Sequence, residues 1–256
     1  PSPDLPPERV SDAPPFVNTG LDFVGPLFIL RHGTDSLSSD KVYILLFTCA
    51  SLRGVHLELT PSLSVASFLC AFRRFVGRRG LPSRLLTDNA KTFKVASKEI
   101  MKLSRAPEVA TYLTSNRITW LFTVEKALWW GGFWERLVRS IKRPFKKVLG
   151  RSSLTYDKLN TIIIEIESLI NARPITYVFD DQESISYALS PSQLLYGRRL
   201  ASIPNDEIYE IQCTNRSLTR RARHQRNVMQ QFTNRRGKEY LLNLHEQSVC
   251  ISKGKK

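Results

Sequence analysis

The sequence predicts an α/β fold, with a five-stranded mixed sheet flanked by helices and followed by a basic helical tail. Three strand-like runs follow one another closely between residues 19 and 60, and a helix and a fourth strand then follow up to residue 89. A fifth apolar run at 118 to 124 precedes two long segments with helical periodicity. Closely spaced strands pair antiparallel, and strands joined through a helix pair in parallel, so we expect a mixed sheet.

The first three strands are predicted at residues 19 to 30, 41 to 52 and 54 to 60. A polar loop, "RHGTDSLSSD", joins the first two, and a tight turn at Arg53 and Gly54 joins the second and third. Connections this short are typical of an antiparallel meander.

A helix is predicted next, in "SVASFLCAFRRFVGRRG", because its apolar side chains recur at helical spacing. They are Val65, Phe68, Leu69, Phe72, Phe75 and Val76. The short strand "SRLLTDN" follows and ends in polar residues. This succession predicts that the fourth strand joins the sheet in parallel.

Two further helices are predicted after the fifth strand, and residues 92 to 117 are expected to be helical in part. In "WWGGFWERLVRSIKRPFKKVLG", residues 129 to 150, one apolar stripe contains Trp134, Leu137, Val138, Ile141, Phe145 and Val148. The segment from 155 to 175 is predicted to be a long helix that stops at Pro174. Toward the core or a partner it carries Leu159, Ile162, Ile163, Ile166, Leu169 and Ile170, with Ile164 on a different face.

Composition divides the chain into three parts. Residues 1 to 15 are proline-rich and lack apolar periodicity, which indicates an extended lead-in. Residues 16 to 205 hold the predicted core. Residues 206 to 256 are polar and arginine-rich with a thin apolar stripe, which predicts a basic helical tail.

Net charge indicates the class of partner. The chain has 38 Lys and Arg against 23 Asp and Glu, a formal charge of +15, and such a surface usually faces a polyanion, of which nucleic acid is the leading candidate. An anionic membrane is the competitor, but the longest apolar stretch, "YILLFTCA", is too short to span a bilayer, and no signal peptide opens the chain. We therefore expect a soluble, intracellular protein. The four cysteines show no CxxC spacing, so buried free thiols are expected rather than disulfides or zinc ligands.

Three acids stand where a site on this sheet could form. Asp22 lies within the first strand, on the face opposite Leu21 and Phe23, and Asp88 lies at the end of the fourth strand. If those strands are neighbours, both carboxylates emerge on the same side, and the helix that carries Glu135 can cross that edge. Each acid also has an ordinary interpretation, as a solvated strand residue, a turn residue or a first-turn helix acid.

Three converging carboxylates could bind two divalent metal ions, which activate an attacking oxygen and stabilise a leaving one at phosphorus. Arg139, Lys142 and Lys146 follow Glu135 as a solvent-facing row of cations that could hold the phosphates of a substrate. Alternatively, Glu135 and Arg139 form an ordinary helix ion pair. His56 lies on a polar face of the third strand and is expected to be a solvated histidine rather than a general base.

Six separated blocks resemble the integrase of BEL/Pao-type retrotransposons, a branch of the retroviral integrase superfamily. They occur in the family's order as "NTGLDFVGP", "VHLEL", "FRRFVGRRGLPSRLLTDNAKTF", "WWGGFWERLVRSIKRPFKKVLG", "LTYDKLNTIIIEIESLINARPI" and "LSPSQLLYGRR", within roughly residues 6 to 200. The resemblance implies an RNase H-like core whose acid triad falls on Asp22, Asp88 and Glu135 and binds two Mg²⁺ or Mn²⁺ ions. Asn89 and Lys91 match DNA-proximal positions of the family motif.

The chain departs from the family pattern at two positions and at both ends. Ala90 stands where the family usually has Gly, and Leu128 where it usually has Pro. No His or Cys of a zinc-binding amino-terminal module precedes His32, and the small β-barrel that the family places after the core is missing. A truncated chain or an element remnant is therefore expected.

The resemblance implies metal-dependent DNA 3′-end processing and strand transfer, the reactions of a polynucleotidyl transferase with endonuclease activity. Its partners would be double-stranded DNA, from element ends and target, and further copies of the chain, without a membrane, in the nucleus at the time of integration. A catalytically silent or domesticated DNA-binding remnant is the main alternative. An RNase H-type nuclease is disfavoured, because such a site normally adds a fourth carboxylate, and Asp157, Glu165 and Glu167 offer no convincing candidate.

Overall fold

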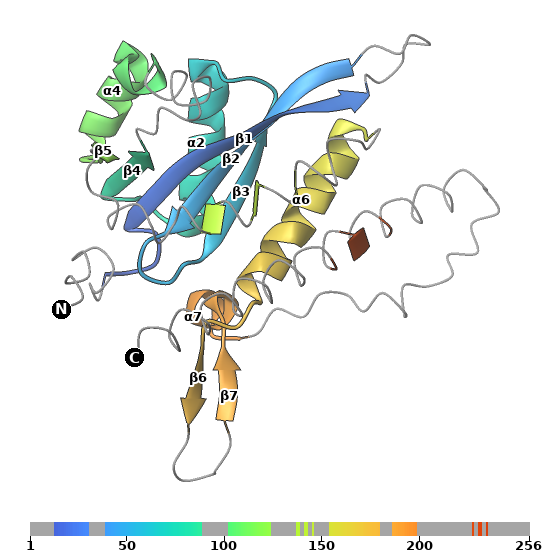
Figure 1. Ribbon diagram of the computed structural model, residues 1–256. Helices are drawn as coiled ribbons and strands as arrows, with labels where there is room; N and C mark the ends of the chain where they lie inside the picture. The colour runs from blue at the N-terminus through green and yellow to red at the C-terminus, as the bar shows by residue number, and fades with distance from the viewer. Residues whose placement is uncertain are drawn as a thin grey trace, which may run out of the picture.

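One five-stranded sheet forms the centre of the molecule (Figure 1). The computed structural model describes residues 13–30, 39–88, 102–123, 154–179 and 186–198, with helical positions at 137–138, 141–142, 145, 227, 230–231 and 234. The strands are β1 (Asn18–Leu30), β2 (Ser39–Cys49), β3 (Val55–Thr60), β4 (Arg84–Asp88) and β5 (Thr119–Thr123). They lie in the order β3-β2-β1-β4-β5.

Strand directions confirm the predicted mixed sheet. The first three strands pair antiparallel, and β4 pairs in parallel with both β1 and β5. An antiparallel meander that continues into two parallel strands on the far side of β1 is the arrangement of an RNase H-like fold. The predicted α/β fold class is therefore confirmed, including the adjacency of the first and fourth strands on which the acid site depends.

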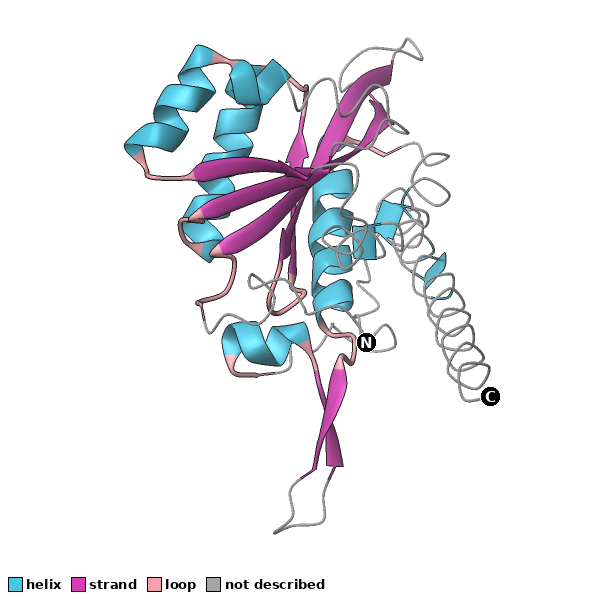
Figure 2. Cartoon of the chain, turned by 60° about the vertical axis from the view of Figure 1, so that its left-hand side comes forward, coloured by secondary structure: helices cyan, strands magenta, loops and turns pink. Residues whose placement is uncertain are grey.

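Helices cover both faces of the sheet (Figure 2). On one face lie α2 (Val65–Arg79) and α4 (Pro107–Ser115), and on the other lies α6 (Tyr156–Asn171). The first face buries an aromatic cluster that includes Phe23, Phe47, Phe68, Phe72 and Phe75. The second is aliphatic and joins Ile44, Leu46, Leu57 and Leu59 of the sheet to Ile162, Ile163, Ile166 and Ile170 of α6. The long helix thus carries its predicted apolar stripe into the core.

Local signals explain where α2 begins and ends. The Ser64 hydroxyl accepts a hydrogen bond from the backbone N–H of Ser67, which satisfies one of the open donors of the first turn. After Arg79 the chain turns through Gly80 at φ 88°, a backbone conformation that glycine adopts at low cost. Cys49 is buried as expected, whereas Cys70 is exposed, because it lies on the solvent side of α2.

A two-stranded hairpin and a short helix follow α6, and the sequence did not predict the hairpin. They are β6 (Thr176–Phe179), β7 (Ser186–Leu189) and α7 (Pro191–Tyr196), and the hairpin projects away from the main sheet (Figure 1). Ser190 and Gln193 form a capping box at the start of α7. None of the helices described is long and apolar enough to cross a membrane.

Candidate active site

Asp22 lies in the middle of β1, opposite Leu46 of β2. Its neighbours Leu21 and Phe23 belong to the aromatic cluster, so Asp22 lies on the opposite face, as predicted. The carboxylate is 23% exposed, and its Oδ1 accepts a hydrogen bond of 2.7 Å from the backbone N–H of Phe23. Asp22 is therefore at the margin of the core and not inside it. A catalytic acid requires such a position, because it has to be reached from solvent.

Asp88 is the last residue of β4, next to β1. The parallel register pairs Asn18 with Arg84 and Gly20 with Leu86. Continued two residues beyond the Gly20–Leu86 pair, the same register would set Asp22 level with Asp88. The two acids therefore lie on neighbouring parallel strands, and Asp88 is at the carboxyl end of β4.

The described residues of the 129–150 segment pack on the face of the sheet where Asp22 lies. Its described residues are helical, and Val138, Ile141 and Phe145 are all buried in the aliphatic cluster with Val24 of β1. These residues belong to the apolar stripe predicted for 129 to 150, so the described part of that stripe is confirmed as core-facing. The described residues of the stripe therefore share a cluster with β1 on this face.

Lys142 belongs to the same segment and pairs with Asp22. Its Nζ lies 2.6 Å from Asp22 Oδ2, and the lysine side chain is 18% exposed. Lys142 was predicted in a solvent-facing row of cations, and in this respect the prediction was wrong. It lies next to the buried Ile141, which holds its backbone against the sheet and directs the ammonium to the acid on β1.

The other predicted site residues lie outside the described residues or have only a backbone position. Outside the described residues lie Glu135, Asn89, Lys91, Arg139 and Lys146. For Asp88 the structure describes the backbone alone. Among the side chains that the structure describes, no group of three His, Cys, Asp or Glu could hold a metal ion. The acid triad therefore stays a prediction, for which the pairing of β1 with β4 makes the first two acids neighbours in strand order.

The residues present fit a hard divalent cation in kind. Magnesium and manganese prefer carboxylate oxygens, and Asp22 and Asp88 offer such donors from neighbouring strands. Asp22 is also partly open to solvent. Lys142 limits the fit, because its ammonium already neutralises one oxygen of Asp22, and a cation on that oxygen would require the lysine to move away.

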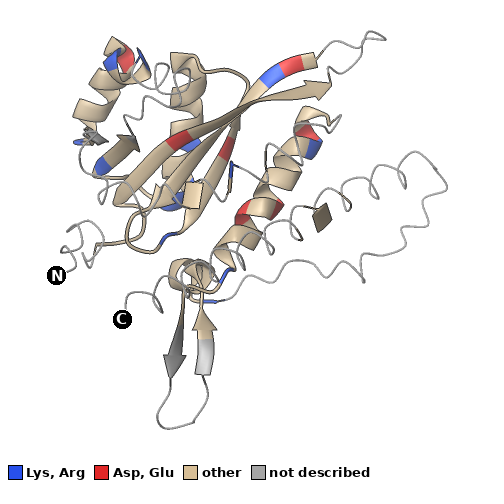
Figure 3. Ribbon diagram, viewed as in Figure 1, with Lys and Arg blue, Asp and Glu red and all other residues tan. Residues whose placement is uncertain are grey.

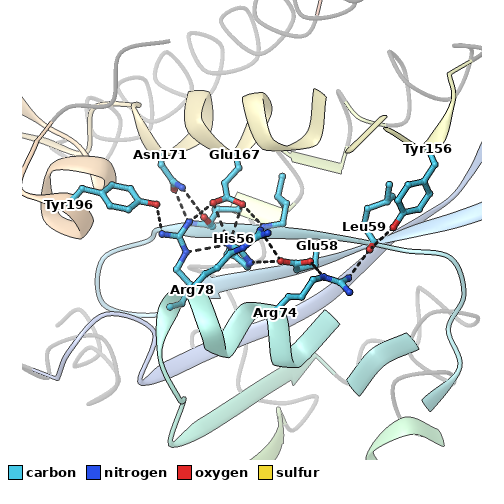
Figure 4. A network of polar contacts seen from close by, with 12 residues as sticks. His56, Glu58, Leu59, Arg74, Arg78, Tyr156, Glu167, Asn171 and Tyr196 are labelled. Atoms are coloured by element: carbon cyan, nitrogen blue, oxygen red, sulfur yellow. Dashed lines mark hydrogen bonds and ion pairs between the residues drawn. The ribbon is translucent and has the colours of Figure 1, made fainter. Parts of the chain in front are cut away.

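A second cluster of charged side chains surrounds β3, the edge strand beyond β2 (Figure 4). His56 and Glu58 are only 1% and 4% exposed, and His56 Nε2 lies 3.0 Å from Glu58 Oε1. From α6, Glu167 approaches His56 Nδ1 at 3.3 Å. The expectation of a solvated His56 was therefore wrong, because α2 and α6 close over the edge strand from its two faces.

Arginines of α2 complete this cluster. Arg74 Nε donates to Glu58 Oε2 over 2.6 Å, and Arg78 Nη1 donates to Glu58 Oε1 over 3.2 Å. Arg79, 8% exposed, donates to Glu167 and to the hydroxyl of Tyr196 on α7. Buried carboxylates are tolerated here because each is paired with cations and hydrogen-bonded.

The network shifts the ionisation of its members in opposite directions. Burial opposes the charged imidazole, but hydrogen bonds to Glu167 and Glu58 outweigh it and raise the pKa of His56, even though the charge of Arg79 acts against protonation. Burial would likewise raise the pKa of Glu58, but hydrogen bonds from His56 and Arg74 outweigh it and lower that pKa. The network therefore favours the protonated form of His56 and the ionised form of Glu58 relative to the free side chains.

The outward backbone groups of β3 are satisfied by side chains instead of another strand. Asn171 accepts from Val55 N over 2.8 Å and donates to Val55 O over 2.7 Å. Glu167 Oε2 accepts from Leu57 N over 2.8 Å, and Arg74 Nη2 donates to Leu59 O over 3.1 Å. We therefore assign this cluster to the structure of the fold.

Sequence reasoning missed this cluster, although a partial signal existed. Arg74 and Arg78 are four residues apart on one helix, opposite a strand on which His56 alternates with Glu58. Their pairing across two elements could have been suspected. The contribution of Glu167 could not, because it depends on how α6 crosses the sheet.

Comparisons with known proteins leave the family open. No model of a known protein family matches the chain, and no curated protein matches it. Among solved structures, it is similar to a chain in a cryo-EM structure of the simian T-cell lymphotropic virus intasome in complex with PP2A regulatory subunit B56 gamma. The identity is 14% and the TM-score 0.47, and the match covers 80% of this chain and 64% of that chain, less than two thirds of its length. A likeness this distant transfers no function.

Proposed function

We propose that the chain is the catalytic core of a BEL/Pao-type retrotransposon integrase, which processes DNA 3′ ends and transfers them to a target strand. The observation that supports the proposal is the parallel pairing of β1 with β4, because its register, continued to Asp22 and Asp88, would set the two acids level, and Val138, Ile141 and Phe145 pack on the same face as Asp22. An acid pair on adjacent parallel strands, with a third acid in a helix across it, is a two-metal arrangement.

In this proposal Asp22, Asp88 and Glu135 would hold two Mg²⁺ or Mn²⁺ ions. Such ions lower the pKa of a bound water and stabilise charge on the leaving oxygen at phosphorus. The protein's own contribution is position, because the sheet sets the spacing of the first two acids. Asn89, Lys91, Arg139, Lys142 and Lys146 would hold the phosphates of double-stranded DNA, which the charge of +15 favours.

The test is metal-dependent nicking or joining of duplex DNA by the purified chain. Asp22→Asn and Glu135→Gln should each abolish the reaction while leaving the fold intact, because each removes a carboxylate donor without changing side-chain size. Asp157→Asn, which removes an exposed acid on α6, is the matched control and should remain active. Full activity of Asp22→Asn would overturn the proposal.

A second candidate is a catalytically silent DNA-binding remnant, and the Asp22–Lys142 pair is the observation that favours it. An acid neutralised by a lysine at 2.6 Å needs no metal to be stable. Salt-dependent DNA binding without nicking or joining under any divalent metal would select this candidate. An RNase H-type nuclease gains no support, because Asp157 and Glu165 are exposed on α6 and Glu167 is held by the β3 cluster.

A further inference from the structure

Three exposed arginines lie at one end of the main sheet, the end opposite the carboxyl end of β4. Arg53 is in the turn between β2 and β3, Arg84 begins β4, and Arg117 comes two residues before β5. Backbone contacts place them at the same end, since Arg84 is the register partner of both Asn18 and Thr119, and Arg53 N donates to Cys49 O. We call these three residues the arginine rim.

The described acidic residues are distributed differently. Asp22, Asp40, Asp88, Glu108 and Asp157 lie toward the other end of β1 and β4 or at the starts of helices that run toward the rim. Glu165 is exposed in the later half of α6, and Glu58 and Glu167 are engaged with His56 and the arginines of α2. In Figure 3 the lower end of the sheet carries blue segments, whereas at its upper end a red and a blue segment lie side by side. Among the described residues, the strand ends and turns at the rim therefore carry arginines without an acid, whereas at the other end Asp40 stands beside Lys41.

The backbone at the rim gives an independent indication. Arg53 and Arg117 have φ values of 55° and 56°, in the left-handed region that glycine or asparagine adopts at lower cost. Arg173 Nη2 donates to Arg53 O over 2.6 Å, and Arg117 N donates to Thr114 O over 3.0 Å, so both turns are held in place. Two of the three rim arginines thus occupy positions where their side-chain type is unfavourable for the backbone. Strain of this kind points to a function of the side chain.

The dimensions of the rim select an extended ligand. It runs from the β2–β3 turn, across β1 and β4, to β5, which is roughly 15 Å at the usual strand spacing of about 4.8 Å. One small anion cannot contact three guanidinium groups spread over that distance. Duplex DNA carries about one phosphate charge per 1.7 Å of its axis, so it offers several phosphates within it, and arginine forks match phosphate oxygens.

We propose that the arginine rim is a second nucleic-acid-binding surface, separate from the acid site and contacting the phosphate backbone. The role assigned to this surface is binding alone, and it does not depend on the proposed catalytic activity. An acidic protein segment could also meet three arginines, but the length of the rim and the net charge of the chain favour a regular polyanion.

The first test replaces Arg53, Arg84 and Arg117 together by Gln and measures duplex DNA affinity between 50 and 200 mM salt without divalent metal. The slope of log affinity against log salt should become shallower by about 2 to 3, because each lost phosphate contact removes about 0.9. The matched control replaces Lys41, Arg105 and Lys158 by Gln, an equal charge change toward the other end of the sheet. The control should alter the slope by less than half as much. Equal effects would overturn the proposal.

The second test separates binding from folding. Arg53→Gly with Arg117→Gly should weaken DNA binding while Tm stays the same or rises, because glycine relieves the positive φ. A fall in Tm with unchanged DNA affinity would show that these arginines are structural. Loss of poly-glutamate binding with DNA binding intact would also overturn the proposal. Because no metal is present, failure here is distinguishable from loss of nicking in Asp22→Asn.

Discussion

The Asp22–Lys142 pair decides how the acid site can be used. At 2.6 Å the ammonium stabilises the carboxylate, and it also competes with any metal ion for the same oxygen. In the proposed integrase this lysine has to change partner when a metal binds. A phosphate of DNA is the natural acceptor, since it carries the charge that Asp22 gives up.

Replacing Lys142 by Gln should strengthen Mg²⁺ binding. The variant removes a positive charge beside Asp22, and for a partly exposed pair the gain should be at most about 1 kcal/mol, or about fivefold. The measurement is the Mg²⁺ concentration that gives half of the metal-induced rise in Tm. Lys158→Gln, on α6, is the control and should not change it. Unchanged or weaker Mg²⁺ binding in Lys142→Gln would contradict the metal assignment of Asp22.

His56 predicts a pH dependence of stability. Its folded pKa is raised above the ordinary 6.5, so its contribution is fully present below pH 6.5 and is lost as the pH rises through the folded pKa. The pKa of Glu58 is lowered from 4.5, so its contribution is present above pH 4.5 and is lost as the pH falls through the lowered value. The network should therefore contribute most between these two ordinary values.

Urea unfolding of the wild type and of His56→Gln at several pH values from 5.5 to 8.5 checks this expectation. The difference in free energy of unfolding should be largest at the acid end of this range and should shrink as the pH rises. A difference that grows with pH would mean that His56 is neutral in the folded protein.

At the scale of elements, the edge strand β3 is the most unusual part of the sheet. An edge strand normally offers a row of open backbone groups to which another chain can add. Here Asn171 and Glu167 of α6, with Arg74 of α2, take up those groups. The two helices therefore close the edge as an additional strand would.

Asn171→Leu should destabilise the protein by about 2 to 4 kcal/mol, because it leaves both the N–H and the carbonyl of Val55 buried without partners. Denaturant unfolding measures the loss. Asn160→Leu, the same substitution at a partly exposed position of α6, is the control and should cost much less. An equal cost for the two variants would show that the contacts to Val55 are unimportant.

Elements with strong periodicity could be predicted from the sequence, and contacts between elements could not. The five strands, α2 and α6 lie close to their predicted ranges, because alternation and helical spacing mark them directly. The β6–β7 hairpin was missed, since strands of four residues leave too little pattern.

The candidate site follows the same division. The positions of Asp22 and Asp88 on neighbouring strands follow from strand order, which the chain's pattern indicates. The turn of Lys142 toward Asp22 and the burial of His56 depend on how helices cross the sheet, and a linear sequence does not record that.

At the scale of the whole molecule, Ile164 is 50% exposed on α6, although the opposite side of this helix is buried in the core. The proposed integrase would assemble into homo-oligomers, and this exposed position is available to a second copy or to the chain's own tail. Light scattering at micromolar concentration should show a mass above that of a monomer, and Ile164→Glu should reduce it.

Removal of residues 206 to 256 distinguishes the two possible covers of Ile164. If a second copy covers this position, the shortened chain should keep the same number of copies per assembly. If the tail covers it, the shortened chain should associate more than the full chain. A monomer in both the full and the shortened chain would contradict self-association.

The segment from Leu154 to Asn171 also has a mechanical consequence. Leu154 O accepts from Leu30 N at the far end of β1, and Asn171 holds Val55 at the near end of β3, so the segment is attached at two opposite corners of the meander. It braces the meander diagonally, and sliding of β1 past β3 would have to break at least one of the two attachments. Strands β4 and β5 lie outside this braced half. When a force is applied to the molecule, the sheet should therefore deform first between β1 and β4, the two strands that carry Asp22 and Asp88.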